Sequence, residues 1–560
     1  MKKITISIGA VLLVLILAVA IYFLFIKDKP AEVDNPNVTT APTATPVPTE
    51  APTITPDPDE TQTGLNLYPA TQRIGEATKY GYIDNTGNFV IKPAYDYAYD
   101  FSDGLAVVMS GEKYMVIDPS GAVIFENNSV IRPFHNGFAA FSQIKEAASS
   151  FGYINTLGEI VIEPQFLYAD DFNQDGQAYV VLTDGKTFER VDTAGKIVET
   201  YILDLGNSFV NGIEDGYVLY YDQNAMKNGV TTVNGETVLK PEYAEITYIG
   251  NDLFAVKNLQ PFEAPLVPAA LYNAKGEQLT DYSLYDIQHF NGDYTSAADE
   301  TSVFFIDKTG QVVSSLPSYD GVGKITLLND IVKTEIDGDL AYYRLDNTLL
   351  WKNDNSTDFE NGITVKQMKF NPLRNVSVHY PKVEGLPDEN VQRKINEDLE
   401  TYFTEARANI TKEDFITVQD DYTAQLKKNL LMITMTGYDY TGGAHGMPLR
   451  VDYLIDTTNG NFYELKDLFK KDSGYKTKIN EIIQAAIDDN MAAGGGMYVE
   501  DAFKGISDAQ NFYLDGDNLV IFFYPYDIAP YAAGFPEFKI PFADLTEFIN
   551  TDGGFWKAFN

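Results

Sequence analysis

The chain contains no cysteine and only four histidines among its 560 residues. Without cysteine there is no disulfide framework, no thiolate metal site, no cysteine nucleophile and no lipid on a cysteine behind a signal peptide. The histidines are far apart in the sequence, and none has the spacing of a zinc motif such as HExxH. They are His135, His289, His379 and His445. We therefore expect no metal site.

Two motifs of catalysis and nucleotide binding are also missing. The sequence has no Gly-x-Ser-x-Gly elbow, which would present a serine nucleophile, and no P-loop, which would bind phosphates. We therefore expect no catalytic residue, no cofactor and no enzymatic activity.

Basic side chains are scarce, since 41 Lys and Arg face 80 Asp and Glu, which gives a formal net charge of −39. Such a chain repels a phosphate backbone, which excludes nucleic acid as the main partner. Tryptophan is rare as well, with 2 residues, while 37 Tyr, 34 Phe and 42 Gly are present. This composition favours many short aromatic strands separated by turns, so most of the chain should be β-structure.

An apolar run near the start predicts a membrane anchor. Residues 4–26 carry no charge and are long enough, at about 1.5 Å per residue, to cross a hydrocarbon core of about 30 Å. A cleaved signal peptide is the alternative, because Ala18, Val19 and Ala20 resemble a cleavage site. The apolar run continues beyond them to Ile26, which favours a retained transmembrane helix within residues 1–29.

Residues 30–67 are dominated by Pro, Thr, Asp and Glu and predict an extended stalk. The lysines on the two sides of the apolar run balance each other and do not set its orientation. Because the rest of the chain is acidic and lacks cysteine, we expect a single-pass cell-membrane protein with its C-terminal bulk outside the cell, as in Gram-positive bacteria.

A repeated unit follows the stalk. Residues 80–93 match residues 151–164 closely, each with an aromatic-Gly pair, an Asp or Asn turn closed by Gly, and an Ile-x-Pro step. Weaker copies of the turn recur at spacings of 34 to 41 residues. The turn glycines are Gly87, Gly121, Gly158, Gly195, Gly235, Gly276 and Gly310. About eight units, each of three or four short strands, therefore fill residues 68–352.

Units of this size suit two architectures. A ring of eight would close as a β-propeller without exposed edge strands. An open β-solenoid is the alternative.

A different pattern covers residues 365–550 and predicts an α+β domain. Asp388 precedes Val391, Ile395, Leu399 and Phe403, as an N-cap precedes the apolar face of a helix. Residues 478–491 predict a second amphipathic helix. Its apolar side is Ile479, Ile482, Ile483, Ala486 and Ile487. Strands are predicted at residues 376–380, 430–434 and 453–456, and a hairpin at 511–523.

Both regions resemble known bacterial families. The repeats resemble the WG-repeat family, with Tyr80 and Phe151 where the family usually has Trp. Residues 438–446, 464–469 and 524–534 resemble the paired domains of unknown function DUF4163 and DUF3298 of exported Gram-positive proteins. This second resemblance implies an envelope-facing binding or sensing role, as in lysozyme-sensing anti-sigma factors. The three residues before the apolar run supply no cytosolic domain for anti-sigma activity. The family also occurs beside peptidoglycan deacetylase domains, but we expect no metal-binding domain of that kind here.

The ligand-binding candidates come from those motifs. His445 lies in a Gly-Gly-Ala-His-Gly segment whose glycines let the backbone approach a ligand. Tyrosine rings can stack on sugar rings or form an interface, and the candidates are Tyr438, Tyr440, Tyr524, Tyr526 and Tyr531. The alternative is that His445 is structural and the tyrosines are half-buried strand packing. Acidic runs at residues 354–358 and 515–517 are expected to be solvated turns, because they lack the calcium-loop pattern.

These observations predict a membrane-anchored, extracytoplasmic binding or sensing protein of the cell envelope. Its expected ligand is a cell-wall glycan or an external, lysozyme-like protein whose positive charge would suit the acidic chain. The alternatives are a structural spacer in envelope assembly and a carboxylate-based hydrolase acting on wall glycan. The sequence does not predict an oligomeric state.

Overall fold

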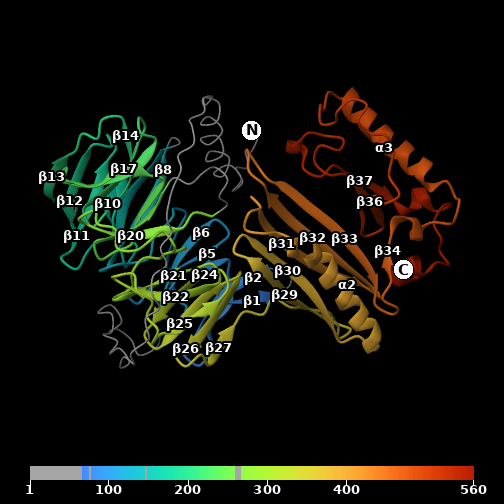
Figure 1. Cartoon of the computed structure of the whole chain (residues 1–560), viewed down its shortest axis with the longest axis horizontal. Helices are drawn as coiled ribbons and strands as arrows, with labels where there is room; N and C mark the ends of the chain where they lie inside the picture. Colours follow the sequence, from blue (N-terminus) through green and yellow to red (C-terminus); the bar gives the residue numbers. More distant parts are fainter. Residues whose placement is uncertain (1–65, 75–76, 146–147, 259–265) are drawn as a thin grey trace, which may run out of the picture. The chain divides into compact units, whose positions relative to one another are not determined.

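The computed structural model describes residues 66–74, 77–145, 148–258 and 266–560 (Figure 1). The predicted anchor at residues 1–29, and the predicted stalk up to residue 65, lie outside these ranges. No helix in the described part of the chain is both long and apolar enough to cross a bilayer. The chain divides into two compact units, Thr53–Thr411 and a second unit that contains Lys412–Asn560.

The repeat region of the first unit forms seven antiparallel sheets among the described residues. The first three sheets are β1 (Tyr68–Ile74), β2 (Ala77–Ile83) and β3 (Phe89–Tyr95); β4 (Tyr97–Ala98), β5 (Ala106–Ser110), β6 (Lys113–Ile117) and β7 (Val123–Asn127); and β8 (Phe138–Lys145), β9 (Ala148–Asn155), β10 (Ile160–Ala169), β11 (Gln177–Leu182), β12 (Thr187–Asp192) and β13 (Ile197–Ile202). The prediction of a mostly β chain is therefore confirmed.

Four further sheets complete the repeat region (Figure 1). They are β14 (Ser208–Glu214), β15 (Tyr217–Asp222), β16 (Lys227–Thr232) and β17 (Thr237–Tyr243); β18 (Glu245–Tyr248), β19 (Leu253–Lys257) and β20 (Ala269–Asn273); β21 (Tyr294–Ala298), β22 (Ser302–Asp307) and β23 (Tyr319–Asp320); and β24 (Gly323–Leu328), β25 (Ile331–Ile336), β26 (Asp339–Arg344) and β27 (Leu349–Lys352). Two predicted units share the six-stranded sheet, because β10 pairs with β9 near its start and with β11 near its end.

The predicted turn chemistry is confirmed. The Asp84 carboxylate accepts hydrogen bonds from the backbone N–H groups of Thr86 at 2.8 Å and Asn88 at 3.1 Å, and Gly87 has φ 83°. The aromatic-Gly pair has a steric reason. A Cβ at Gly81 would lie 2.6 Å from the Pro93 nitrogen and nearer still to the Ile91 carbonyl oxygen. Only glycine leaves room for the neighbouring strand at that point.

The first and last sheets of the repeat region pack against each other. Tyr68, Ala70 and Ile83 of the first sheet form one buried cluster with Ile331 and Tyr342 of the last. The buried hydroxyl of Tyr342 donates to the Pro69 carbonyl at 2.7 Å across 273 residues of sequence. The two ends of the array are therefore in contact, and we call this junction the seam.

Three strands and a helix complete the first unit: β28 (Thr357–Asp358), β29 (Thr364–Leu373), β30 (Val376–Glu384) and α2 (Glu389–Ala408). Asp388 caps α2 by accepting from the N–H groups of Asn390 and Val391, as predicted. Ile395, Leu399 and Phe403 are buried along one face of the helix. This helix and its cap are thus set by local sequence.

The second unit contains the strands β31 (Thr417–Lys427), β32 (Leu430–Tyr440), β33 (Met447–Asp456) and β34 (Phe462–Tyr463), and a sheet of β35 (Phe512–Asp515), β36 (Asn518–Phe522) and β37 (Glu537–Pro541). Its helices are α3 (Tyr475–Ala492), α4 (Gly554–Phe559) and the short 3-10 turns η2 (Leu465–Leu468), η3 (Tyr531–Ala533) and η4 (Phe542–Leu545).

Helix α3 packs on these sheets through Ile479, Ile483 and Ile487, which share a buried cluster with Leu430 and Leu519. The second predicted helix is therefore present and begins three residues earlier than predicted. The expected burial of Ala486 is wrong, because that side chain is exposed.

Candidate functional site

The predicted ligand-binding residues gather at the loop between β32 and β33. Gly442 and Gly443 both have φ 91°, a left-handed conformation that glycine adopts readily. A Cβ on Gly446 would lie 2.6 Å from the Asp439 carbonyl oxygen, so the loop closes tightly behind His445. The side chain of His445 is consequently held at the surface.

Three rings stack there, which we call the His445 platform: His445 and Tyr526, which are exposed, and Tyr531, which is partly buried. The His445 and Tyr531 rings stack with centroids 3.7 Å apart and an interplanar angle of 22°. The Tyr526 ring lies 5.9 Å from that of Tyr531, and its hydroxyl is 3.3 Å from Nε2 of His445. Nδ1 of His445 lies 3.0 Å from the Gly446 carbonyl oxygen, which can only accept. In neutral imidazole Nδ1 then carries the proton and Nε2 accepts from Tyr526.

Tyr526 has a backbone conformation that tyrosine rarely adopts. Its φ is 74°, and its side chain is 59% exposed. The turn is held by hydrogen bonds from the Tyr524 N–H to the Asp527 carboxylate at 2.9 Å and from the Tyr526 N–H to the Ala529 carbonyl at 2.9 Å. Positive φ at a bulky residue costs on the order of 1–3 kcal/mol, and such outliers cluster at binding sites. Here the strained residue presents a ring to solvent.

The other predicted tyrosines support the platform from outside the stack. The Tyr438 hydroxyl accepts from the Gly446 N–H at 2.6 Å, and the Tyr440 hydroxyl donates to the Gly443 carbonyl at 3.0 Å. Burial raises the pKa of Tyr531, and so do electrostatic repulsion from Tyr438 when it is ionised and a hydrogen bond with Tyr438. Tyr524 is half-buried and donates to the Arg450 carbonyl at 2.6 Å, and burial raises its pKa. The structure therefore assigns bracing contacts to Tyr438, Tyr440 and Tyr524.

Sequence reasoning missed a charged network on the neighbouring strands. The Arg450 guanidinium lies 4.3 Å from the Tyr513 ring centroid and 4.7 Å from that of Phe522. It pairs with Asp452 at 3.0 Å and Glu537 at 2.8 Å. Burial is the largest influence on Asp452 and raises the pKa of that carboxyl despite the adjacent guanidinium. No local signal marks this network, because its members come from four strands, β33, β35, β36 and β37, and are separated by up to 87 residues.

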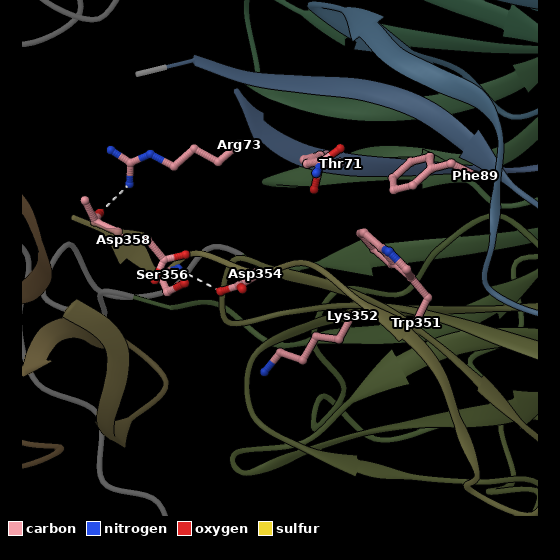
Figure 2. A pocket seen from close by; sticks show the side chains of 10 residues that line it. Thr71, Arg73, Phe89, Trp351, Lys352, Asp354, Ser356 and Asp358 are labelled. Atoms are coloured by element: carbon pink, nitrogen blue, oxygen red, sulfur yellow. Dashed lines mark hydrogen bonds between the residues drawn. The ribbon is translucent and has the colours of Figure 1, made fainter. Parts of the chain in front are cut away.

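Sequence reasoning also missed a pocket at the seam (Figure 2). This seam pocket has a volume of about 460 Å³ and is lined from the first sheet of the array, from β27 and from the residues that follow it. The lining residues are Thr71, Gln72, Arg73, Phe89, Trp351, Lys352, Asp354, Ser356, Thr357 and Asp358.

Figure 2 shows Phe89 and Trp351 facing each other on one side of the pocket. Their ring centroids are 6.3 Å apart, in an edge-to-face arrangement. On the other side Arg73 donates to the Thr357 hydroxyl at 2.8 Å, across 284 residues of sequence. The Asp354 carboxylate accepts from the Ser356 N–H at 2.9 Å, and this bond lowers the pKa of Asp354.

The remaining histidines have separate surroundings. His135 lies 3.6 Å from the Asp171 carboxylate, His289 contacts the Phe290 carbonyl, and His379 contacts the Asp337 carbonyl. Among the residues that the structure describes, no three His, Asp or Glu side chains are placed to hold a metal ion.

Comparison with protein families identifies three segments. Residues 80–114 and 151–186 match the WG containing repeat, and residues 466–543 match DUF3298, a protein family of unknown function. Residues 369–448 match a family described as Deacetylase PdaC. A search of curated proteins found no match.

Several solved structures are similar to parts of the chain. A DUF3298 family member from Bacteroides fragilis is 19% identical, with 37% of this chain and 98% of that one covered at a TM-score of 0.27. One from Pseudomonas aeruginosa is 16% identical, covering 34% and 96% at 0.27. Kluyveromyces lactis Hsv2p is 12% identical, covering 45% and 93% at 0.26.

The family matches confirm both resemblances on which the sequence analysis relied, apart from DUF4163, which stays a prediction. Two segments of this chain therefore match the WG containing repeat, and a C-terminal segment matches DUF3298.

Proposed function

We propose that the chain is a non-catalytic, ligand-binding protein of the bacterial cell envelope. Residues 1–29 would anchor it in the membrane, and both compact units would lie outside the cell. The observation that carries this proposal is the His445 platform, in which a strained Tyr526 exposes its ring to solvent beside the stacked pair of His445 and Tyr531. The WG repeats and the DUF3298 and PdaC matches fit an envelope-associated protein.

A cell-wall glycan is the ligand class that the platform favours. Each pyranose ring has an apolar C–H face and a polar rim of hydroxyl groups. Aromatic rings take the apolar face, and tyrosine hydroxyls and the imidazole exchange hydrogen bonds with the rim. Two tyrosines beside a histidine supply both kinds of contact within one small surface.

An external, lysozyme-like cationic protein is the second candidate ligand. The formal charge of −39 favours it, because opposite net charges accelerate association and this attraction weakens with added salt. Tyrosines at the centre of a protein interface also act as binding hot spots.

Two other functions are less well supported. A spacer role needs no ligand-sized hollow, whereas the seam pocket has about 460 Å³. A carboxylate hydrolase needs a general acid with a raised pKa. In the seam pocket, which holds Asp354 and Asp358, the hydrogen bond from Ser356 instead lowers the pKa of Asp354. Burial raises the pKa of Asp170 and Asp452, but neither of these carboxyls lines the seam pocket. We also propose that the repeats close in the manner of a β-propeller, which the packing of the first sheet on the last supports.

The test is binding of residues 64–560 to intact peptidoglycan sacculi and, separately, to lysozyme at low and physiological salt. We expect saturable binding that the substitutions Tyr526→Ala and Tyr531→Ala each weaken about tenfold. Phe209→Ala is the matched control, because Phe209 is 60% exposed, against 59% for Tyr526, and lies in the repeat region. Binding to neither partner, or binding that both tyrosine variants retain in full, would contradict the proposal.

A further inference from the structure

The seam pocket combines an aromatic surface with a polar one in a single hollow (Figure 2). Its volume of about 460 Å³ lies within the range of about 300–1,000 Å³ typical of small-molecule sites. Phe89 and Trp351 are partly buried, and each also contributes to the hydrophobic cluster that joins the first and last sheets. The aromatic side of the pocket is therefore fixed by the core of the array.

The polar lining carries both donors and acceptors. Arg73 and Lys352 bring two positive charges, while Asp354 and Asp358 bring two negative charges, so these four groups sum to zero. All four already have a partner: Arg73 donates to Thr357, Asp354 accepts from the Ser356 N–H, and Asp358 accepts from the Thr364 hydroxyl at 2.6 Å. Lys352 pairs with Asp339 at 2.8 Å, and because Asp339 also pairs with Lys369 at 2.7 Å, the sum of zero is kept when these two groups are included. Exposed Gln72 adds an amide that can donate and accept.

This balance selects among ligand chemistries. A phosphate or carboxylate ligand would be repelled by the carboxylates of Asp354 and Asp358, and an apolar ligand would displace water from four charged side chains without replacing its hydrogen bonds. A neutral molecule with one apolar face and a rim of hydroxyl groups satisfies both sides of the pocket. A pyranose sugar has that form.

We propose that the seam pocket binds a neutral saccharide of one or two rings, with a C–H face against Trp351 and hydroxyl groups toward Gln72, Arg73 and Asp358. This site is separate from the His445 platform and does not depend on the function proposed for it. Because its lining comes from both ends of the array, a bound saccharide also links the first sheet to the segment that follows the last. Binding therefore stabilises the closed seam.

The chain supplies its own probe for this proposal. It has two tryptophans, Trp351 in the seam pocket and Trp556, which packs on Phe542 and Phe559 in the second unit. In the full-length Trp556→Phe variant, Trp351 is the only tryptophan. Titration with N,N′-diacetylchitobiose, and in parallel with cellobiose, should produce a saturable change in its emission with at least one sugar. The sugar should also raise the midpoint of unfolding that Trp351 reports.

Two rim variants made in the same background test the assignment of residues. Gln72→Ala and Asp358→Asn should each weaken binding about five- to tenfold, since each removes one hydrogen bond to the sugar. Phe209→Ala, in the same array but outside the pocket lining, should leave the affinity unchanged. Absence of a saturable change with both sugars would overturn the proposal. Equal affinity of the two rim variants and their parent would also overturn it.

Discussion

Asp170 offers a direct test of the electrostatics of the repeat array. Its carboxylate accepts from the N–H groups of Asp171 at 2.9 Å and Asp215 at 3.2 Å, and so ties the end of β10 to the turn after β14. Burial outweighs these two donors and raises the pKa of Asp170 from its ordinary value of 3.8 to about 7. The perturbation that we propose is Asp170→Asn, which removes the charge and keeps one acceptor oxygen.

The direction and the size of the expected change in stability follow from the linkage between protonation and folding. Between about pH 4 and 7 the folded state holds a proton on Asp170 that the unfolded chain has released, so the free energy of unfolding falls as the pH rises through this window. A pKa raised from 3.8 to about 7 corresponds to about 4 kcal/mol, an upper limit because contact with solvent reduces it. Relative to its parent, Asp170→Asn should therefore gain stability with rising pH, by up to about 4 kcal/mol between pH 4 and 8.

The assay is urea unfolding of the Trp556→Phe protein, with and without Asp170→Asn, at pH values from 4 to 8. The emission of Trp351 reports the first unit, which matters because two compact units need not unfold in one transition. Asp204→Asn serves as the control, since it also replaces a carboxylate in the first unit but its side chain is 81% exposed. The reasoning is refuted if the stability difference between Asp170→Asn and its parent is the same at every pH, or shrinks as the pH rises.

Four further substitutions test packing and charge. Gly81→Ala should destabilise the first unit by about 3 kcal/mol or more, because the added Cβ would overlap the neighbouring strand. Gly104→Ala should cost only about 1–2 kcal/mol, because its Cβ would meet no atom within 4 Å and only the φ of 73° is unfavourable. Urea unfolding followed by Trp351 measures both, and equal costs would contradict the steric argument. Ile483→Ala should lower the free energy of unfolding of the second unit by about 2–5 kcal/mol, because Ile483 is 0% exposed. The emission of Trp556 in a Trp351→Phe background follows this unit, and a loss under about 1 kcal/mol would count against the placement of Ile483 in the core. Arg450→Ala should lower the free energy of unfolding by about 3–5 kcal/mol in the same assay and should raise the pKa of Asp452 further. The variant should therefore regain part of its lost stability at acidic pH, where Asp452 is protonated. An unchanged dependence of stability on pH would argue against the pairing of Arg450 with Asp452.

Features that depend on neighbouring residues in the chain were predictable. The cap at Asp388 and the turn at Asp84 and Gly87 each require a side chain and backbone groups within four residues, so their sequence patterns specify the geometry. The family resemblances had the same basis, because they rest on short contiguous motifs.

Features assembled from distant segments were not predictable. Trp351 and Phe89 meet only because the last sheet of the array packs against the first, and no spacing in the sequence encodes that contact. Tyr524 and Tyr526 differ in exposure and contacts for a related reason. A left-handed turn exposes Tyr526, whereas Tyr524 bonds to Arg450, 74 residues earlier. Residue type alone gave the two tyrosines the same prediction.

The contact between Tyr342 and Pro69 also has a consequence for folding during synthesis. The two residues are 273 positions apart, so at a translation rate of about 5–20 residues per second Tyr342 emerges about 14–55 s after Pro69. During that interval Tyr68, Ala70 and Ile83 have no partner sheet to cover them. A newly made chain is therefore most exposed to aggregation and proteolysis before its last repeat arrives, and truncations that end before residue 342 should be degraded rather than accumulate as shortened arrays.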